Sequence, residues 1–306
     1  MSSSSIDETE TFRCSAYNSE WRKWLEALND LDKGKPGPFV ILSSDDQGIC
    51  ITGRDATRSV LVMAHLLKPA FIHFYSHSHG REFRFPVQSL IKHLRARNVG
   101  DIVHVYHTTD HNDDIQVVSH TANGGQISRI GIHLLEDDEY DAIPNSIVDL
   151  IKPKVKVVMN SVQTAEWRQA LKGLRELTAS TDNIDTDPTG IIKFKLDDDR
   201  VVLSPNLGDE KSTNIPRAVS TISVTPVATK KGMKWMNEFS NFKAPLIYKF
   251  FSYTHDELVL YYCDNASPLC CRYPLSLPPV KGHNVIETGY IEIAMAPMIE
   301  IKDEVM

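Results

Sequence analysis

Three histidines come closest to a metal-binding pattern in this 306-residue sequence. His73, His77 and His79 include an H-x-H pair, and imidazole nitrogen is a common ligand of transition metals. No Cys or Asp stands beside them at a ligand spacing, so we interpret them as a partly exposed cluster at the end of a strand. The acidic runs at residues 137–138 and 197–199 resemble metal sites only in their charge, and we interpret both as solvated turns.

No enzyme motif is recognisable. The sequence has no glycine-rich dinucleotide loop, no phosphate-binding P-loop, no G-x-S-x-G nucleophile elbow and no H-E-x-x-H zinc motif. We therefore expect neither an enzyme nor a bound cofactor. The competing hypothesis is metal-assisted hydrolysis at the three histidines, which requires bound metal in elemental analysis.

Cationic side chains at helical spacing suggest a different chemistry. Arg168, Lys172 and Arg175 follow one another at steps of four and three, which places them along one stripe of a helix. Lys92 and Arg95 are also three residues apart. Such side chains bind phosphate oxygens without reading base sequence, and this binding weakens as salt rises. The pattern indicates a weak, sequence-independent grip on nucleic acid.

Part of this cationic pattern lies on a helix that the sequence contains twice. Residues 20–31 and 166–177 share six of twelve positions at a constant offset of 146, with the skeleton E-W-R-x-x-L-x-x-L-x-x-L. The Trp and Leu positions form one apolar stripe, so each copy pairs a core face with a polar face. Two similar helices half a chain apart predict a duplicated domain. The alternative is coincidence, since amphipathic leucine helices are common.

The charge distribution also favours an anionic partner. The whole chain carries −7, but four expected helices, at residues 19–31, 86–98, 164–177 and 229–243, together carry +6, which leaves −13 for the remainder. A basic set of helices on an acidic body concentrates anions at one surface.

Length and composition fit two domains, each able to bury its own core. We expect a disordered leader over residues 1–11, a first domain over 12–135, a connector over 136–153 and a second domain over 154–302. No apolar run is long enough to span a bilayer, so no membrane partner is expected. Five cysteines without a C-x-x-C motif favour a reducing compartment.

Short strands rich in β-branched and aromatic residues separate the helices. Residues 45–48 are expected to form a hairpin turn between the first two of them. Two helices among antiparallel-looking strands in each half predict the α+β class. The strands are expected at residues 39–42, 49–52, 60–65, 70–75, 102–107, 115–120, 127–134, 155–160, 190–195, 200–203, 220–225, 246–253, 257–262, 269–275 and 290–296.

The order of motifs resembles the sliding clamps of the proliferating cell nuclear antigen family, over roughly residues 12–302. In the first half the resemblance rests on Trp24-Leu-Glu-Ala-Leu-Asn-Asp-Leu31, the Gly48-Ile49 hairpin and Asp55-Ala-Thr-Arg-Ser-Val-Leu-Val62. In the second half it rests on Glu166-Trp-Arg-Gln-Ala-Leu-Lys-Gly-Leu174, Thr189-Gly-Ile-Ile-Lys-Phe194, Met233-Lys-Trp-Met-Asn237, Ala244-Pro-Leu246, Ser267-Pro-Leu269 and Ala294-Met-Ala-Pro-Met-Ile-Glu300. No single motif is diagnostic, and the signal is their colinearity together with the internal repeat.

The resemblance implies the DNA-clamp fold, with two similar domains and three chains closing head to tail into a homotrimeric ring around duplex DNA. It implies a processivity factor for DNA replication and repair, located in the nucleus or at a viral replication site. The alternatives are a subunit of a checkpoint-type heterotrimeric clamp and a viral clamp-like factor. The expected DNA-facing residues are Arg22, Lys23, Lys92, Arg95, Lys172 and Lys234, to which the helical stripe adds Arg168 and Arg175. A family lysine is replaced by Asn29, so the first helix should grip more weakly.

The resemblance also implies partner proteins. In the family, a hydrophobic pocket beneath the connector takes an aromatic-bearing peptide from DNA polymerases and other replication proteins, and a clamp loader is a further partner. Two positions depart from the family, because Arg54 replaces an apolar residue and Ala294 an aromatic one. The matching pocket positions are Arg54, Ile143, Pro144, Pro268, Ala294, Ala296 and Pro297.

Overall fold

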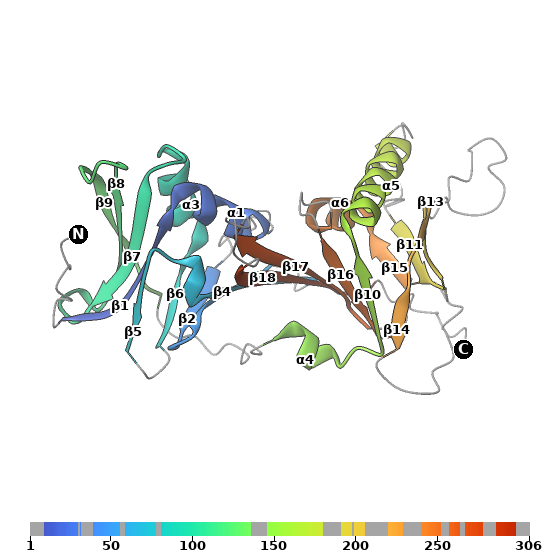
Figure 1. Ribbon diagram of the computed structural model, residues 1–306, viewed down its shortest axis with the longest axis horizontal. Helices are drawn as coiled ribbons and strands as arrows, with labels where there is room; N and C mark the ends of the chain where they lie inside the picture. Colours follow the sequence, from blue (N-terminus) through green and yellow to red (C-terminus); the bar gives the residue numbers. More distant parts are fainter. Residues whose placement is uncertain are drawn as a thin grey trace, which may run out of the picture. The chain divides into compact units, whose positions relative to one another are not determined.

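The computed structural model describes residues 9–29, 31, 39–55, 59–77, 81–135, 146–179, 191–197, 199–205, 220–228, 240–251, 257–263, 267–277 and 286–297. These residues form antiparallel sheets with a few helices, in agreement with the predicted α+β class (Figure 1). The chain divides into two compact units, residues 1–143 with 274–291 and residues 144–273 with 292–306. Residues 274–291, which we had placed in the second domain, therefore cluster with the first.

Two sheets build the first unit. One has the strand order β5-β1-β7-β8-β9, and the other includes the run β18-β4-β3-β2-β6. β1 begins at Glu10, inside the stretch expected to be a leader. The strands are β1 (Glu10–Tyr17), β2 (Phe39–Ser44), β3 (Gly48–Arg54), β4 (Val60–Leu67), β5 (His73–Ser76), β6 (Arg81–Pro86), β7 (Ile102–Thr108), β8 (Asp114–His120), β9 (Gln126–His133) and part of β18 (Ile286–Met295).

The predicted turn between β2 and β3 is confirmed. The Asp45 carboxylate accepts the backbone N–H groups of Gln47 at 2.8 Å and Gly48 at 2.9 Å, so the side chain replaces a backbone acceptor in the turn. β2 and β3 then pair antiparallel from Ser44 opposite Ile49 to Val40 opposite Gly53.

The helices of the first unit are α1 (Asn18–Trp24), α2 (Glu26–Asn29) and α3 (Val87–Arg95), with 3-10 turns η1 (Lys68–Ala70) and η2 (Thr109–His111). Helices were predicted at residues 19–31 and 86–98, and the structure confirms both. The first is broken at Leu25, between α1 and α2. Trp21 and Trp24 are buried and their rings meet edge to face, 5.3 Å apart.

The second unit also has two sheets. One has the order β13-β12-β11-β15, and the other includes the run β14-β10-β16-β17-β18. The helices are α4 (Ile147–Ile151), α5 (Ser161–Ala179) and α6 (Ala244–Phe250). The strands are β10 (Val155–Met159), β11 (Ile191–Leu196), β12 (Arg200–Pro205), β13 (Ser220–Ser223), β14 (Pro226–Ala228), β15 (Ser240–Lys243), β16 (Leu258–Tyr262) and part of β17 (Leu269–Leu277).

The prediction of the fourth helix was wrong over residues 240–242. We expected it near residues 229–242, but 240–243 form β15, with Phe242 opposite Ile192 of β11. The helix begins afterwards, at Ala244, where a strand had been expected over 246–253. The missed signal is Pro245, because a proline in the first helical turn lacks only an N–H that the helix would leave unpaired. Residues 229–239 lie outside the described part of the chain.

The two tryptophan helices have the same structural role. The Trp21 indole donates to the Val103 carbonyl at 3.2 Å, and the Trp167 indole donates to the Phe251 carbonyl at 2.7 Å. Acceptors follow donors by 82 and 84 residues, and both indoles are fully buried. The leucines that follow each tryptophan are buried too, at positions 25 and 28 in the first copy and 171 and 174 in the second. The repeat is therefore a repeat of packing as well as of sequence.

In the second unit, the sheet that contains β16, β17 and β18 packs against different helices on its two faces. Successive side chains of a strand point to opposite faces, and on β17 the Tyr273 hydroxyl donates to the carbonyl of Phe250 in α6 at 3.5 Å. Its neighbour Arg272 binds Glu292, whose other oxygen accepts the N–H of Ile147 in α4. α6 and α4 therefore lie on opposite faces of this sheet, as Figure 1 shows within this unit.

Candidate nucleic-acid interface

The cationic helices of the first unit are bound to each other by two side chains of α1. Asn18 Nδ2 donates to the carbonyls of Leu94, Arg97 and Asn98 at 3.0–3.2 Å. Arg22 Nη2 donates to those of Leu94, Arg95 and Arg97 at 2.9–3.2 Å. The last carbonyls of a helix lack partners within it and carry partial negative charge. Asn18 and Arg22 together therefore cap α3.

This contact changes the interpretation of Arg22. We predicted a phosphate ligand, and the structure gives its guanidinium a structural partner that the sequence did not lead us to expect. Arg22 is half-buried, and its Nε has no hydrogen-bond partner among the described residues. A pattern of charges along one chain cannot reveal that a second helix ends beside it.

Three other predicted cations of this unit are exposed, namely Lys23, Lys92 and Arg95. Arg95 Nη2 donates to Asn29 Oδ1 at 3.1 Å, so α2 restricts the position of its guanidinium. Asn29 was expected only to remove a cation from the first helix. The structure shows that it also orients a cation of α3.

The second unit contributes cations from α5 and α6. Lys172 is exposed and Arg168 is half-buried on α5. The Arg175 side chain and all of Lys234 lie outside the described residues. Lys249 on α6 is exposed, with its ammonium 5.6 Å from the centre of the Phe250 ring, and it was absent from the predicted set. It was missed because the fourth helix was placed too early in the chain.

Histidines add no positive charge to α3 at neutral pH. His93 is buried and its Nε2 lies 2.7 Å from the Ser119 hydroxyl. Burial, followed by the Arg97 charge, lowers the pKa of His93 below its usual value, so its imidazole is neutral. At neutral pH the positive charge of α3 therefore comes from Lys92 and Arg95.

The predicted histidine cluster does not come together as a metal site in the described residues. His73 and His77 are exposed, and His79 lies outside the described part of the chain. No group of three or more potential His, Cys, Asp or Glu ligands occurs among the residues that the structure describes. His73 instead lies near His104, whose pKa burial and the charges of His120, Arg13 and His73 lower to about 4.

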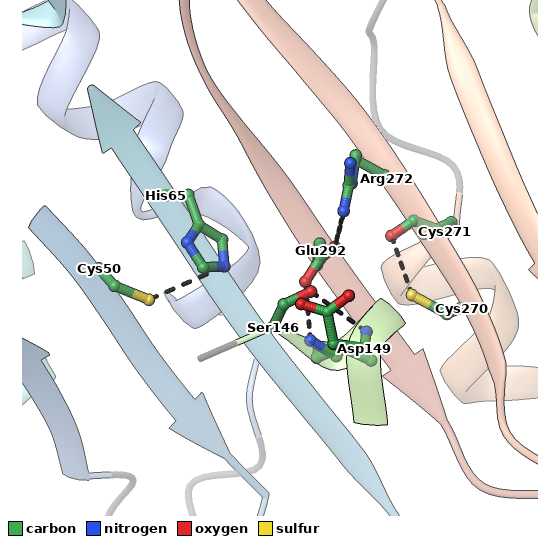
Figure 2. A network of polar contacts seen from close by, with 9 residues as sticks. Cys50, His65, Ser146, Asp149, Cys270, Cys271, Arg272 and Glu292 are labelled. Atoms are coloured by element: carbon green, nitrogen blue, oxygen red, sulfur yellow. Dashed lines mark hydrogen bonds and ion pairs between the residues drawn. The ribbon is translucent and has the colours of Figure 1, made fainter. Parts of the chain in front are cut away.

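One predicted partner-pocket residue, Arg54, is described in the first unit. A Cβ on its neighbour Gly53 would lie 2.7 Å from Leu28 Cδ2 and 2.8 Å from Leu31 Cδ1, so Gly53 is on the face that α2 covers. Arg54 is half-buried on the opposite face. That face also carries Cys50, whose Sγ is 3.9 Å from His65 Nε2 (Figure 2).

The second unit holds the other described pocket positions. Ala294 is 7% exposed and, two residues from Glu292 on β18, lies on the α4 face of the sheet. Ala296 is exposed, and Pro268 and Pro297 are half-buried. Ile143 and Pro144 lie outside the described residues. In each unit the described strand positions of the pocket set lie on the face away from the cationic helices.

The comparisons with known proteins bear on the fold. No protein-family model and no curated protein matches the sequence. Among solved structures, the proliferating cellular nuclear antigen of Entamoeba histolytica matches 95% of this chain and 100% of its own, with a TM-score of 0.65 and 15% identity. A chain of the PCNA2–PCNA3 complex of Sulfolobus tokodaii matches 93% of this chain and 98% of its own length, with a TM-score of 0.62 and 14% identity. The chain therefore has the DNA-clamp fold. Among the described residues, no helix is long and apolar enough to cross a membrane.

Proposed function

We propose that this chain is the subunit of a DNA sliding clamp, a non-enzymatic processivity factor that encircles duplex DNA and tethers replication and repair proteins to it. The observation that carries the proposal is a clamp fold over nearly the whole chain, in which helices of both units present exposed cations. Lys23, Lys92 and Arg95 supply these cations in the first unit, and Lys172 and Lys249 supply them in the second.

The mechanism is topological. A few lysines and arginines per chain give a weak, salt-sensitive contact with phosphates, and none of these contacts reads the base sequence. A closed ring converts this weak contact into a long residence time, because dissociation requires the ring to open or the DNA to end. The same weakness permits sliding.

We propose a ring of three identical chains joined head to tail. A contact of this kind uses two different surfaces of the same chain. β9 ends one sheet of the first unit and β13 ends one sheet of the second, and neither has a strand on its outer side among the described residues. Such edges present N–H and C=O groups that another chain can pair with. β9 also exposes Ile127, which a neighbouring chain would bury.

The proposed partners are a clamp loader, a DNA polymerase and other proteins with an aromatic-bearing clamp-binding peptide. The expected location is the nucleus, or a viral replication site for a virus-encoded chain. Arg54 and Ala294 depart from the family pattern at two of the expected pocket positions, which favours a peptide of altered sequence.

A second candidate is one subunit of a heteromeric clamp of the checkpoint type, and a third is a viral clamp-like monomer. The complex of two different chains from Sulfolobus tokodaii supports the heteromeric candidate, because this fold assembles there with a non-identical partner. The mass of the purified chain in solution separates the main proposal from both alternatives, since only the main proposal expects a stable trimer of one chain.

The decisive experiment loads the purified protein with a clamp loader onto a nicked circular plasmid and then cuts the plasmid once. We expect the protein to stay on the circle and to leave after linearisation. Reversing the charges of Lys92, Arg95, Lys172 and Lys249 together should abolish polymerase stimulation while leaving the trimer intact. Equal retention on circular and linear DNA, or stimulation that survives the charge reversal, would contradict the proposal.

A further inference from the structure

A buried carboxylate lies beneath the start of α4. The Glu292 side chain on β18 is fully buried, and both of its oxygens are used (Figure 2). Oε1 accepts the Arg272 guanidinium, with Nε at 3.0 Å, and Oε2 accepts the backbone N–H of Ile147 at 2.9 Å. A buried charge without partners costs several kcal/mol, so this arrangement is stable only while both partners stay in place.

The Ile147 N–H is a group that α4 cannot satisfy by itself. Ile147 is the first residue of α4, and the first N–H groups of a helix have no acceptor within it. Ser146 accepts the N–H of Asp149 at 3.4 Å and so caps a second such group. The hydrogen bond to Glu292 therefore connects the first residue of this five-residue helix directly to the sheet.

Arg272, the side-chain partner of Glu292, is positioned by an aromatic ring of the neighbouring strand. The Arg272 guanidinium lies over the Tyr261 ring, 5.3 Å from its centre, and this ring is buried. The Ile147 side chain is buried as well, at 1% exposure. Tyr261, Arg272 and Glu292 come from three adjacent strands, so the carboxylate is placed by the sheet and not by α4.

We propose that Glu292 is a positioning residue that fixes the end of the interdomain connector, and through it the proposed peptide pocket. The connector was expected over residues 136–153, and Ile147 lies within it. Ala294, one of the expected pocket residues, follows Glu292 by two positions on β18 and lies on the same face of the sheet. The strand that holds the end of the connector through Glu292 therefore also carries a pocket residue. The effect on peptide binding rests on the proposed function, whereas the hold on α4 does not.

The test compares two substitutions of Glu292 with a matched control. Glu292→Met keeps the length of the side chain and removes both acceptors, and Glu292→Gln keeps one acceptor for the Ile147 N–H. Asp197→Asn is the control, because it removes a carboxylate that pairs with Lys195 at 2.8 Å in the same unit but away from α4. Hydrogen exchange of the amides of residues 147–151 reports on the anchor, and fluorescence anisotropy with a labelled polymerase peptide bearing aromatic residues reports on the pocket.

We expect Glu292→Met to speed exchange in α4 by about 10-fold to 100-fold, the range for losing a hydrogen bond to a charged group. Peptide affinity should fall by about 10-fold, a typical coupling between sites. Glu292→Gln should show a smaller change in both, and Asp197→Asn should show neither. If Glu292→Met does not fold, the comparison of Glu292→Gln with Asp197→Asn decides.

Two results would overturn the inference in different ways. Unchanged exchange in α4 would show that Glu292 does not hold the helix. Faster exchange with wild-type peptide affinity would show that the anchor does not position the pocket. If the unsubstituted trimer binds no such peptide, the partner claim of the proposed function fails, and the exchange measurement alone still decides whether Glu292 is the anchor.

Discussion

The contact between Arg22 and the end of α3 predicts that two neighbouring cations have separable effects. Arg22→Gln removes a charged donor shared by three carbonyls, whereas Lys23→Gln removes an exposed charge. We expect the first substitution to lower stability and the second to lower affinity for DNA. Sequence alone treats both residues as equivalent members of one basic pair.

The expected loss of stability in Arg22→Gln depends on which carbonyls still have a side-chain donor after the substitution. Without Arg22, the Leu94 and Arg97 carbonyls still accept from Asn18, and only the Arg95 carbonyl is deprived of its side-chain donor. Removing a hydrogen bond with a charged partner costs about 1.5–3 kcal/mol, and loss of a cation from a helix C-terminus costs about 0.3–1 kcal/mol. Arg22 Nε is buried without a partner among the described residues, which reduces the net loss. We expect Arg22→Gln to cost about 2 kcal/mol.

The assays are thermal unfolding and DNA binding as a function of salt. A loss of about 2 kcal/mol lowers the Tm of domains of this size by about 4–8 °C. Lys23→Gln should leave the Tm within about 1 °C and should reduce the slope of log K against log salt by about 0.9 for each phosphate that is no longer neutralised. Both variants are measured on the same short duplex, and their masses in solution are compared so that a difference in oligomeric state is detected.

One pattern of results would refute this reasoning. If Arg22→Gln leaves the Tm unchanged and reduces the salt slope as much as Lys23→Gln does, Arg22 binds phosphate and does not cap α3. A loss of stability with an unchanged salt slope would support the cap. A loss of both would show that Arg22 alternates between the helix end and DNA.

Three further predictions concern the repeat, the histidines and α6. Trp21→Phe and Trp167→Phe should each cost about 2–3 kcal/mol in unfolding experiments, because each removes the hydrogen bond of a buried indole and leaves part of the tryptophan's space unfilled. The lowered pKa of His104, about 4, means that the unfolded chain binds its proton first, so stability should fall as the pH drops from 6.5 toward 4, and less in His104→Gln. Lys249→Glu should weaken DNA binding in the salt titration, whereas Lys156→Glu, on the α4 face of the same sheet, should not.

The sequence predicted the parts of the fold that depend on local periodicity. The tryptophan helices, α3 and the turn at Asp45 each have a pattern that fits a single structure, and the structure contains them. Residues 229–250 have no such pattern, because aromatic residues at positions such as Phe242 satisfy a helical stripe and a strand pairing equally well. Residues 240–243 form strand β15 because they pair with β11, and the local sequence contains no sign of this pairing.

The candidate site was only partly predictable for a related reason. Charge and spacing identify which side chains are cationic, but not which of them a neighbouring element uses. Arg22 is drawn to the end of α3 and Arg95 to Asn29, and both contacts join residues more than 60 positions apart. Lys249 could not be found while its helix was misplaced, and Glu292 has a role only because Arg272 and Ile147 meet it.

The alternation of strand side chains separates the two proposed functions within single strands. On β17, Arg272 points to the side of α4 while its neighbour Tyr273 points to α6. On β3, Gly53 lies under α2 while its neighbour Arg54 lies on the other face. A one-residue shift of register would exchange DNA-side and partner-side residues along a whole strand. It follows that adjacent substitutions should affect different activities. A change at Arg272 or Arg54 should alter peptide binding, whereas a change at Tyr273 should act through the helix that carries Lys249.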